Sequence, residues 1–147
     1  MNPEASKEKL RQTVETFWET FPPFWHRVRA QIRQVAADQF EISVEQFHIL
    51  RHIRQGQHSV SDLAEAKHLS RPAISQAVEV LVQKGLIARS PSTQDRRHVQ
   101  LALTASGNAL LDAIFDHIYE WMMQTLSALT DEELDALTRS MDSLRKT

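Results

Sequence analysis

The sequence predicts a mainly α-helical protein with one small β wing. Apolar residues recur at helical spacing along most of the 147 residues, and this periodicity is typical of amphipathic helices. From Val99 to Leu103, apolar and polar residues alternate instead, which indicates a half-buried strand. A short apolar run from Leu86 to Ala88 precedes that strand, with a polar turn between the two runs. Two short helices next to a hairpin, with longer helices at both ends of the chain, form the arrangement of a winged helix-turn-helix.

Two helices are expected ahead of the winged region. The first covers residues 5–20, and Pro22 with Pro23 then interrupts the pattern, because proline lacks an amide hydrogen and its ring clashes with the preceding turn. The second helix begins near Pro23 and carries its apolar residues on one stripe. We assign residues 1–40 to N-terminal dimerisation helices.

Later helix starts are marked by hydroxyl side chains that can accept a hydrogen bond from a free backbone amide. These starts are Ser43 with Gln46, Ser59 with Asp62, Ser70, Thr104, and Thr130 with Glu133. Gly56 and Gly85 mark two helix ends, because glycine takes the left-handed conformation at little cost. The segments divide into a winged helix-turn-helix DNA-binding domain at residues 41–104 and C-terminal dimerisation helices at residues 105–147.

The helix from Ser70 to Lys84 is the candidate DNA reader. In a helix-turn-helix the first helix braces the second, whose N-terminal residues enter the major groove. The spacing of the apolar residues turns one stripe inward, namely Ile74, Val78 and Leu81. The outer face is left with Ser70, Arg71, Pro72, Ala73, Ser75, Gln76 and Glu79.

The chemistry of this outer face suits DNA. Arg71 can bind guanine or a phosphate, Gln76 can pair with adenine, and Ala73 can touch a thymine methyl group. The hydroxyl groups of Ser70 and Ser75 are better suited to phosphates. We therefore expect double-stranded DNA to be the main partner.

The hairpin tip carries two arginines, Arg96 and Arg97, behind Asp95. An arginine on a thin two-stranded ribbon can enter the narrow, electronegative minor groove beside the major-groove site. We expect Arg96 and Arg97 to contact DNA and Asp95 to organise Arg97. A surface hairpin with one ion pair is the simpler interpretation, but it leaves the adjoining helix pair and the strand order unexplained.

The formal net charge of −2 is unevenly distributed along the chain. Basic residues outnumber acidic ones between Arg51 and His98, whereas acidic residues dominate from Asp112 to Asp142. Phosphate neutralisation needs lysine and arginine. The middle of the chain is therefore the part expected to meet DNA.

The run SDLAEAKHLSRPAISQAVEVLVQKGLIAR from Ser61, followed by DRRHVQLALTASG, resembles the MarR family of bacterial transcriptional regulators. The resemblance implies helices before and after the winged region that intertwine into a two-fold dimer. It also implies DNA contacts from Arg71 to Gln76 and a minor-groove contact from Arg97. This sequence departs from the family at His68, where glycine is common, and in a longer N-terminal helix.

The terminal helices also favour a homodimer on their own evidence, because they carry more large apolar residues than one small domain can cover. These residues are Phe17, Trp18, Phe21, Phe24, Trp25, Trp121 and Met122. A two-fold dimer would place its reader helices about 34 to 36 Å apart and bind a pseudo-palindrome. Repression by occupying a promoter is the simplest action for such a dimer.

The resemblance further implies a small aromatic or amphipathic effector that releases DNA from a crevice between the dimer helices and the winged domain. The candidate lining residues are Phe21, Phe24, Trp25, His26, Phe47, Arg51 and Trp121. An aromatic stripe at helical spacing also suits a hydrophobic core, so both interpretations stay open.

Other kinds of function have weaker support in the sequence. His48 and His52 are four residues apart and, with His117, Asp116 or Glu120, would suit zinc, but the chain has no HExxH motif and no cysteine. No nucleophile and base pairing or phosphate loop indicates an enzyme. We expect no cofactor, no membrane segment and a cytoplasmic protein. The alternative is a winged-helix protein-interaction module without specific DNA binding.

Overall fold

The computed structural model describes residues 3–92 and 99–147, and their elements follow one another in a simple order. They are α1 (Pro3–Phe40), α2 (Val44–Arg54), α3 (Val60–Lys67), α4 (Arg71–Gln83), β1 (Ile87–Pro91), β2 (Val99–Leu103), α5 (Ala105–Leu126) and α6 (Asp131–Leu144). The predicted fold class, mainly α with a small β wing, is confirmed.

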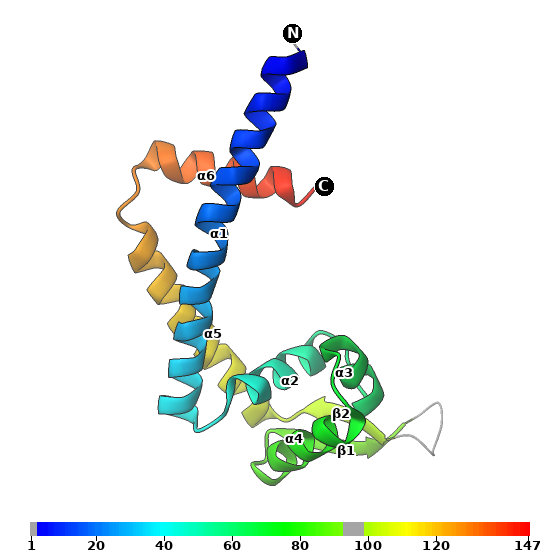
Figure 1. The fold of residues 1–147 in the computed structure, drawn as a ribbon. Helices are drawn as coiled ribbons and strands as arrows, with labels where there is room; N and C mark the ends of the chain where they lie inside the picture. Colours follow the sequence, from blue (N-terminus) through cyan, green and yellow to red (C-terminus); the bar gives the residue numbers. More distant parts are fainter. Residues whose placement is uncertain (1–2, 93–98) are drawn as a thin grey trace.

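Figure 1 shows a compact winged region of α2, α3, α4 and the hairpin, from which α1 and α5 extend together toward α6. Among the described residues, no helix is both long and apolar enough to cross a membrane.

The prediction of two N-terminal helices is wrong, because α1 runs without a break through Pro22 and Pro23. An internal proline costs a helix about 3 kcal/mol, so neighbouring contacts must offset the loss. Rings four residues apart stack across this point: Phe17 lies 5.1 Å from Phe21, and Phe21 lies 6.5 Å from Trp25, measured between ring centroids. Such aromatic pairs contribute about 0.5–1.5 kcal/mol each beyond the area they bury. The stacked rings therefore help to hold α1 together where the backbone loses hydrogen bonds.

The predicted helix starts are confirmed at the level of single hydrogen bonds. Capping boxes open α2 at Ser43 and α6 at Thr130, where the side chains of the first and fourth residues each satisfy the other's backbone amide. The hydroxyls of Ser59, Ser70 and Thr104 each accept from the backbone amide three residues later. These local bonds explain why the boundaries of α2 to α6 follow directly from the sequence.

Two of the helices end at residues other than glycine that have positive backbone φ angles. His68 closes α3 at φ 53° and ψ 39°, so it adopts the left-handed conformation that glycine commonly supplies at this turn of the family. Glu41, with φ 53°, follows α1, and the Ile42 amide then donates to the Ala36 carbonyl at 3.1 Å. This bond spans six residues, as in a Schellman motif, and fixes the direction in which the chain enters α2.

The core joins the winged region to the inner ends of α1 and α5. Its largest fully buried residues are Phe47, Ile49, Leu50, Leu63, Ile74, Leu81, Ile87, Leu101, Leu111, Ile114 and Val78. The antiparallel hairpin contributes Ile87 and Leu101 to this core. Val99 was expected to face inward as well but is 53% exposed, because it pairs with Pro91 at the outer end of the hairpin.

Candidate nucleic-acid interface

Helix α4 is fixed to the winged region by one apolar stripe. Ile74, Val78 and Leu81 are 1%, 0% and 0% exposed, so they hold the helix against the core as predicted. All the proposed DNA contacts on the opposite face are exposed, namely Ser70, Arg71, Pro72, Ala73, Ser75 and Gln76. The predicted orientation of α4 is thereby confirmed, while the DNA contacts themselves stay a prediction.

The N-terminal end of α4 has the charge that a phosphate needs. The Ser70 hydroxyl accepts from the Ala73 amide at 3.4 Å, and the first turn contains no acidic residue. Arg71 occupies the first helical position, where its side-chain charge adds to the partial positive charge of the helix end. This end of α4 is therefore suited to meet the DNA backbone or a base edge.

The strands of the wing lie next to α4. β1 and β2 pair over five residues each, and the amide of Leu101, in the middle of β2, donates to the His58 carbonyl at 2.7 Å. Asp95, Arg96 and Arg97 lie outside the described residues. Their roles at the DNA therefore remain predictions from the sequence.

The sequence did not indicate a partner for Arg89, one of the basic residues of the middle segment, which lies on β1 beside the reader helix. Its Nη1 atom donates to Oε2 of Glu79 at 2.6 Å. The two residues are ten positions apart in different elements, so no helical or strand periodicity could have paired them. Only the packing of α4 against β1 brings them together.

Polar side chains also join the winged region to the terminal helices. Arg54 on α2 donates from Nη1 to Oδ1 of Asp112 on α5 at 2.6 Å, and its guanidinium lies 5.2 Å from the Phe115 ring centroid. Lys84, at the end of α4, donates from Nζ to the Glu41 carbonyl at 2.5 Å. These contacts connect α2 to α5 and the end of the reader helix to the residue that follows α1.

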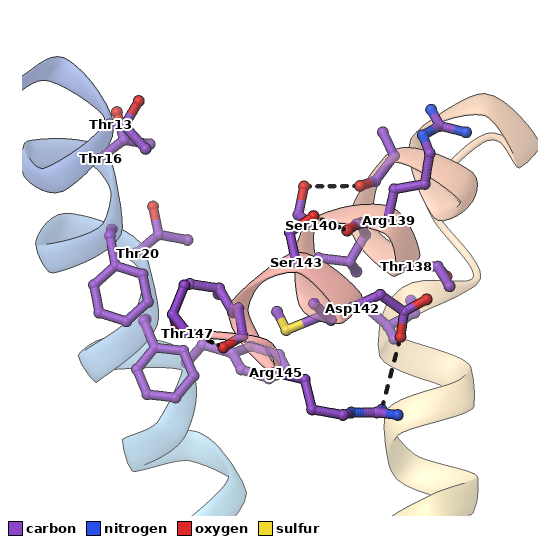
Figure 2. Close-up of a pocket in the computed structure, with 18 of the residues that line it drawn as sticks. Thr13, Thr16, Thr20, Thr138, Arg139, Ser140, Asp142, Ser143, Arg145 and Thr147 are labelled. Carbon is purple, nitrogen blue, oxygen red and sulfur yellow. Dashed lines mark hydrogen bonds and ion pairs between the residues drawn. The ribbon is translucent and has the colours of Figure 1, made fainter. Parts of the chain in front are cut away.

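The residues predicted to line an effector crevice do not form one cleft. Phe24 stacks on Trp121 at 6.4 Å, and Phe21 and Phe24 line a cavity of about 1410 Å³ between α1, α5 and α6. Figure 2 shows the α1 wall of this cavity, with Thr13, Thr16 and Thr20, facing the residues of α6. The other predicted residues, Trp25, His26, Phe47, Arg51 and Trp121, do not line it.

Phe47 in particular is a correction to the predicted crevice. It is 1% exposed and packs its ring against Phe115 at 5.8 Å, so it belongs to the core of the winged region. Aromatic residues on α1 and α2 have the same spacing whether they line a crevice or fill a core. Their separation here follows from how α1 and α5 cross, which the sequence pattern does not specify.

The histidines considered for zinc are not gathered into a metal site within the described parts of the chain, where no group of three or more potential ligands occurs. His48 and His52 both lie on α2 and are partly buried. Burial lowers the pKa of His48, and Lys67 adds to this effect more than Arg29 and Arg51 do, while Glu45 opposes it. Burial, followed by Lys67 and Arg51, also lowers the pKa of His52.

Because the pKa values of His48 and His52 are lowered, we expect the free energy of unfolding to fall as the pH falls and these two histidines of α2 take up protons. A histidine with a folded-state pKa below 6.5 takes up its proton more readily when the chain unfolds. Its contribution to stability is therefore complete above about pH 7 and is lost as the pH falls below 6.5 toward the folded-state pKa. We expect His48→Gln to lose less unfolding free energy than the wild type between about pH 7 and pH 5 in urea titrations. Parallel losses over that interval would contradict the prediction, and parallel behaviour between about pH 7.5 and 8.5 serves as the internal control.

Comparison with known proteins matches both the winged region and the whole fold. The MarR family model matches residues 42–99. The HTH-type transcriptional repressor MdtR of Bacillus subtilis is 35% identical over 81 residues, which cover 55% of this chain and 52% of that repressor. The alignment therefore spans about half the length of MdtR.

Two solved structures of MepR mutants from S. aureus resemble the chain over most of its length. One, a single-residue mutant, is 29% identical and covers 88% of this chain and 96% of that one, with a TM-score of 0.73. Another mutant, bound to an oligodeoxyribonucleotide, is 28% identical with the same coverage and a TM-score of 0.66. The relatives are named as regulators and not as enzymes, in line with the expectation from the sequence. Residues 42–99 therefore match the MarR family of transcriptional regulators, and the chain as a whole shares the winged helix-turn-helix architecture of the MepR structures.

Proposed function

We propose that the protein is a homodimeric repressor that binds a pseudo-palindromic DNA operator and responds to a small effector. The observation that carries the DNA-binding part is the geometry of α4. Its inner stripe is fully buried, and its outer face presents Arg71 to Gln76 beside the wing. The DNA-bound structure of MepR supports the same role for this chain.

The MdtR relative, named a repressor, supports repression. A regulator that acts on promoters would work in the cytoplasm.

The dimer proposal is supported by the apolar surface of the terminal helices. The most exposed large apolar residues there are Leu10, Trp18, Tyr119 and Met123, at 66%, 68%, 67% and 59%. The cavity between α1, α5 and α6 is about 1410 Å³, above the roughly 300–1,000 Å³ usual for small ligands. A helix of a second copy fits this space better than a small molecule does. We therefore assign α1, α5 and α6 to the dimer interface.

The effector proposal concerns the packing of α1 against α5. Phe24 of α1 and Trp121 of α5 form a stacked pair, and the Arg27 guanidinium lies 5.7 Å from the Trp121 ring centroid. We propose that an aromatic or amphipathic ligand competes for this pair. Calorimetric titration of the operator complex with phenolic compounds tests the proposal, and compounds that bind without weakening DNA affinity would overturn it.

Replacing Arg71 with alanine should weaken operator binding by about 1–3 kcal/mol, or roughly 5- to 150-fold. The expected loss follows from the exposed position of Arg71 at the first turn of α4. Fluorescence anisotropy with the chain's own upstream DNA and with a scrambled duplex, over a salt series, measures it. A phosphate contact would weaken both duplexes equally, whereas a guanine contact would weaken the operator more.

Arg33→Ala is the matched control, because Arg33 is also an exposed arginine but lies on α1. We expect this variant to bind DNA like the wild type. On the sequence evidence for the wing, Arg97→Ala should also lose operator binding. A wild-type chain without affinity for any duplex would overturn the proposed function and favour a protein-interaction module.

A further inference from the structure

Glu79 has an unexpected position on the reader helix. It is the only acidic residue in α4, whose sequence is RPAISQAVEVLVQ. Arg71, Ser75 and Glu79 follow one another at intervals of four residues, so they share one face of the helix. The face proposed to meet DNA therefore includes a carboxylate, which phosphates would repel.

Both oxygens of this carboxylate have a donor. Oε2 accepts from Nη1 of Arg89 at 2.6 Å, and Oε1 accepts from Nε2 of Gln83 at 3.5 Å. The side chains of Glu79 and Arg89 are 48% and 40% exposed, so both can be reached by a partner molecule. Arg89 stands on β1, opposite Leu101 of β2, in the strand that leads to the wing tip. Two elements that pack on each other thus hold an acid and a base together at the edge of the proposed interface.

We propose that the ion pair of Glu79 and Arg89 keeps Arg89 away from the DNA backbone and so limits sequence-independent binding. An unpaired arginine at this position would contact a phosphate and release a counterion, whereas the paired arginine presents no net charge with its partner. Glu79 is therefore a positioning residue, which acts on DNA through Arg89. This inference rests on the proposed DNA-binding function and concerns the strength of its electrostatic part.

The physical consequence is a low affinity for DNA that lacks the operator sequence. Non-specific affinity arises almost wholly from phosphate contacts, and each such contact steepens the dependence of log K on log salt by about 0.9. A repulsive or masked group is one of the ways in which a surface is kept from binding unwanted partners. The single acid of α4 supplies such a group at a position separate from the residues proposed to contact bases.

A double-mutant cycle on the salt dependence tests this proposal. Glu79→Gln, Arg89→Gln and the double variant are compared with the wild type by anisotropy on a random-sequence duplex. Glu79→Gln frees the arginine, so its salt slope should steepen by about 0.9, and its advantage over the wild type should grow about 3- to 4-fold between 200 and 50 mM salt. Arg89→Gln exposes the carboxylate and should bind more weakly. The double variant should return to wild-type affinity and slope.

Glu15→Gln is the matched control, since it removes an acid from an arginine pair on α1, where Glu15 meets Arg11 at 3.2 Å and does not line the cavity assigned to the second copy. Its salt slope should equal that of the wild type. Urea unfolding of every variant separates a folding defect from a binding change.

Two results would overturn the inference while leaving the proposed function intact. If Arg89 already contacts a phosphate, Glu79→Gln will leave the slope unchanged, and both variants that lack Arg89 will lose about one contact. If the pair lies outside the interface, all four slopes will agree. A wild-type chain that binds no duplex would instead overturn the proposed function and this inference with it.

Discussion

Replacing Gly107 with alanine should lower the free energy of unfolding by about 3 kcal/mol, as overpacking a fixed backbone does. Gly107 is buried in the first turn of α5, and a Cβ atom there would overlap the Leu86 carbonyl oxygen and lie 3.1 Å from its carbon. Leu86 cannot move away easily, because its carbonyl accepts from the Thr104 amide at 3.1 Å and its amide donates to the Leu81 carbonyl at 3.0 Å. The substitution should therefore disturb the end of α4, the start of the wing and the start of α5 together.

The loss is measured as a shift of the urea unfolding midpoint. Ser106→Ala is the neighbouring control, because Ser106 is exposed in the same turn and should change stability by less than about 0.5 kcal/mol. If the Gly107→Ala variant unfolds at the same urea concentration as the wild type, α5 does not approach Leu86 this closely.

Placing a charge on α1 at Phe17 should dissociate the proposed dimer. Phe17 is 41% exposed and lines the cavity between α1, α5 and α6, so a glutamate there costs the single chain its ring stack on Phe21 but would in addition be buried by a second copy. Urea unfolding of the variant measures the first effect separately from the second. A central interface residue contributes about 2 kcal/mol or more, which corresponds to a rise of roughly 30-fold or more in the dimer dissociation constant. Operator affinity should fall with it, because a monomer reads only one half-site.

Sedimentation of Phe17→Glu over a concentration series measures the dissociation constant directly. Glu19→Gln, two residues away and also exposed, should sediment like the wild type. A wild-type chain that stays monomeric at micromolar concentration, or a Phe17→Glu variant that still dimerises fully, would contradict the assignment of the cavity to a second copy.

The features that could be predicted from the sequence depend on neighbours in the chain. A serine three residues from the amide that it caps marks a helix start whatever the rest of the fold does, so Ser43 and Ser70 were identified correctly. His68 stands where the resemblance leads one to expect glycine, and its φ of 53° shows that it takes the left-handed conformation itself. The inward stripe of α4 followed from helical spacing in the same way.

The features that could not be predicted depend on how elements pack. The break expected at Pro22 ignored the ring stacking of Phe17, Phe21 and Trp25, whose strength depends on side-chain geometry. The assignment of Phe47 to a crevice failed because its surroundings come from α5, more than sixty residues later in the chain. The pairing of Glu79 with Arg89 required the position of β1 against α4.

The unbroken helix α1 is long enough for a small tilt to move its inner end by several ångströms. Its 38 residues make a rod of about 57 Å at about 1.5 Å per residue. Its inner end adjoins Glu41, whose carbonyl binds Lys84 at the end of the reader helix. If the outer part of α1 is held by a second copy, a tilt of about 5° would move the inner end by about 5 Å over that length. This displacement exceeds the rise of one base pair, about 3.4 Å, so if the winged region follows the inner end of α1 as one body, a tilt of a few degrees would shift each reader helix by more than one base pair.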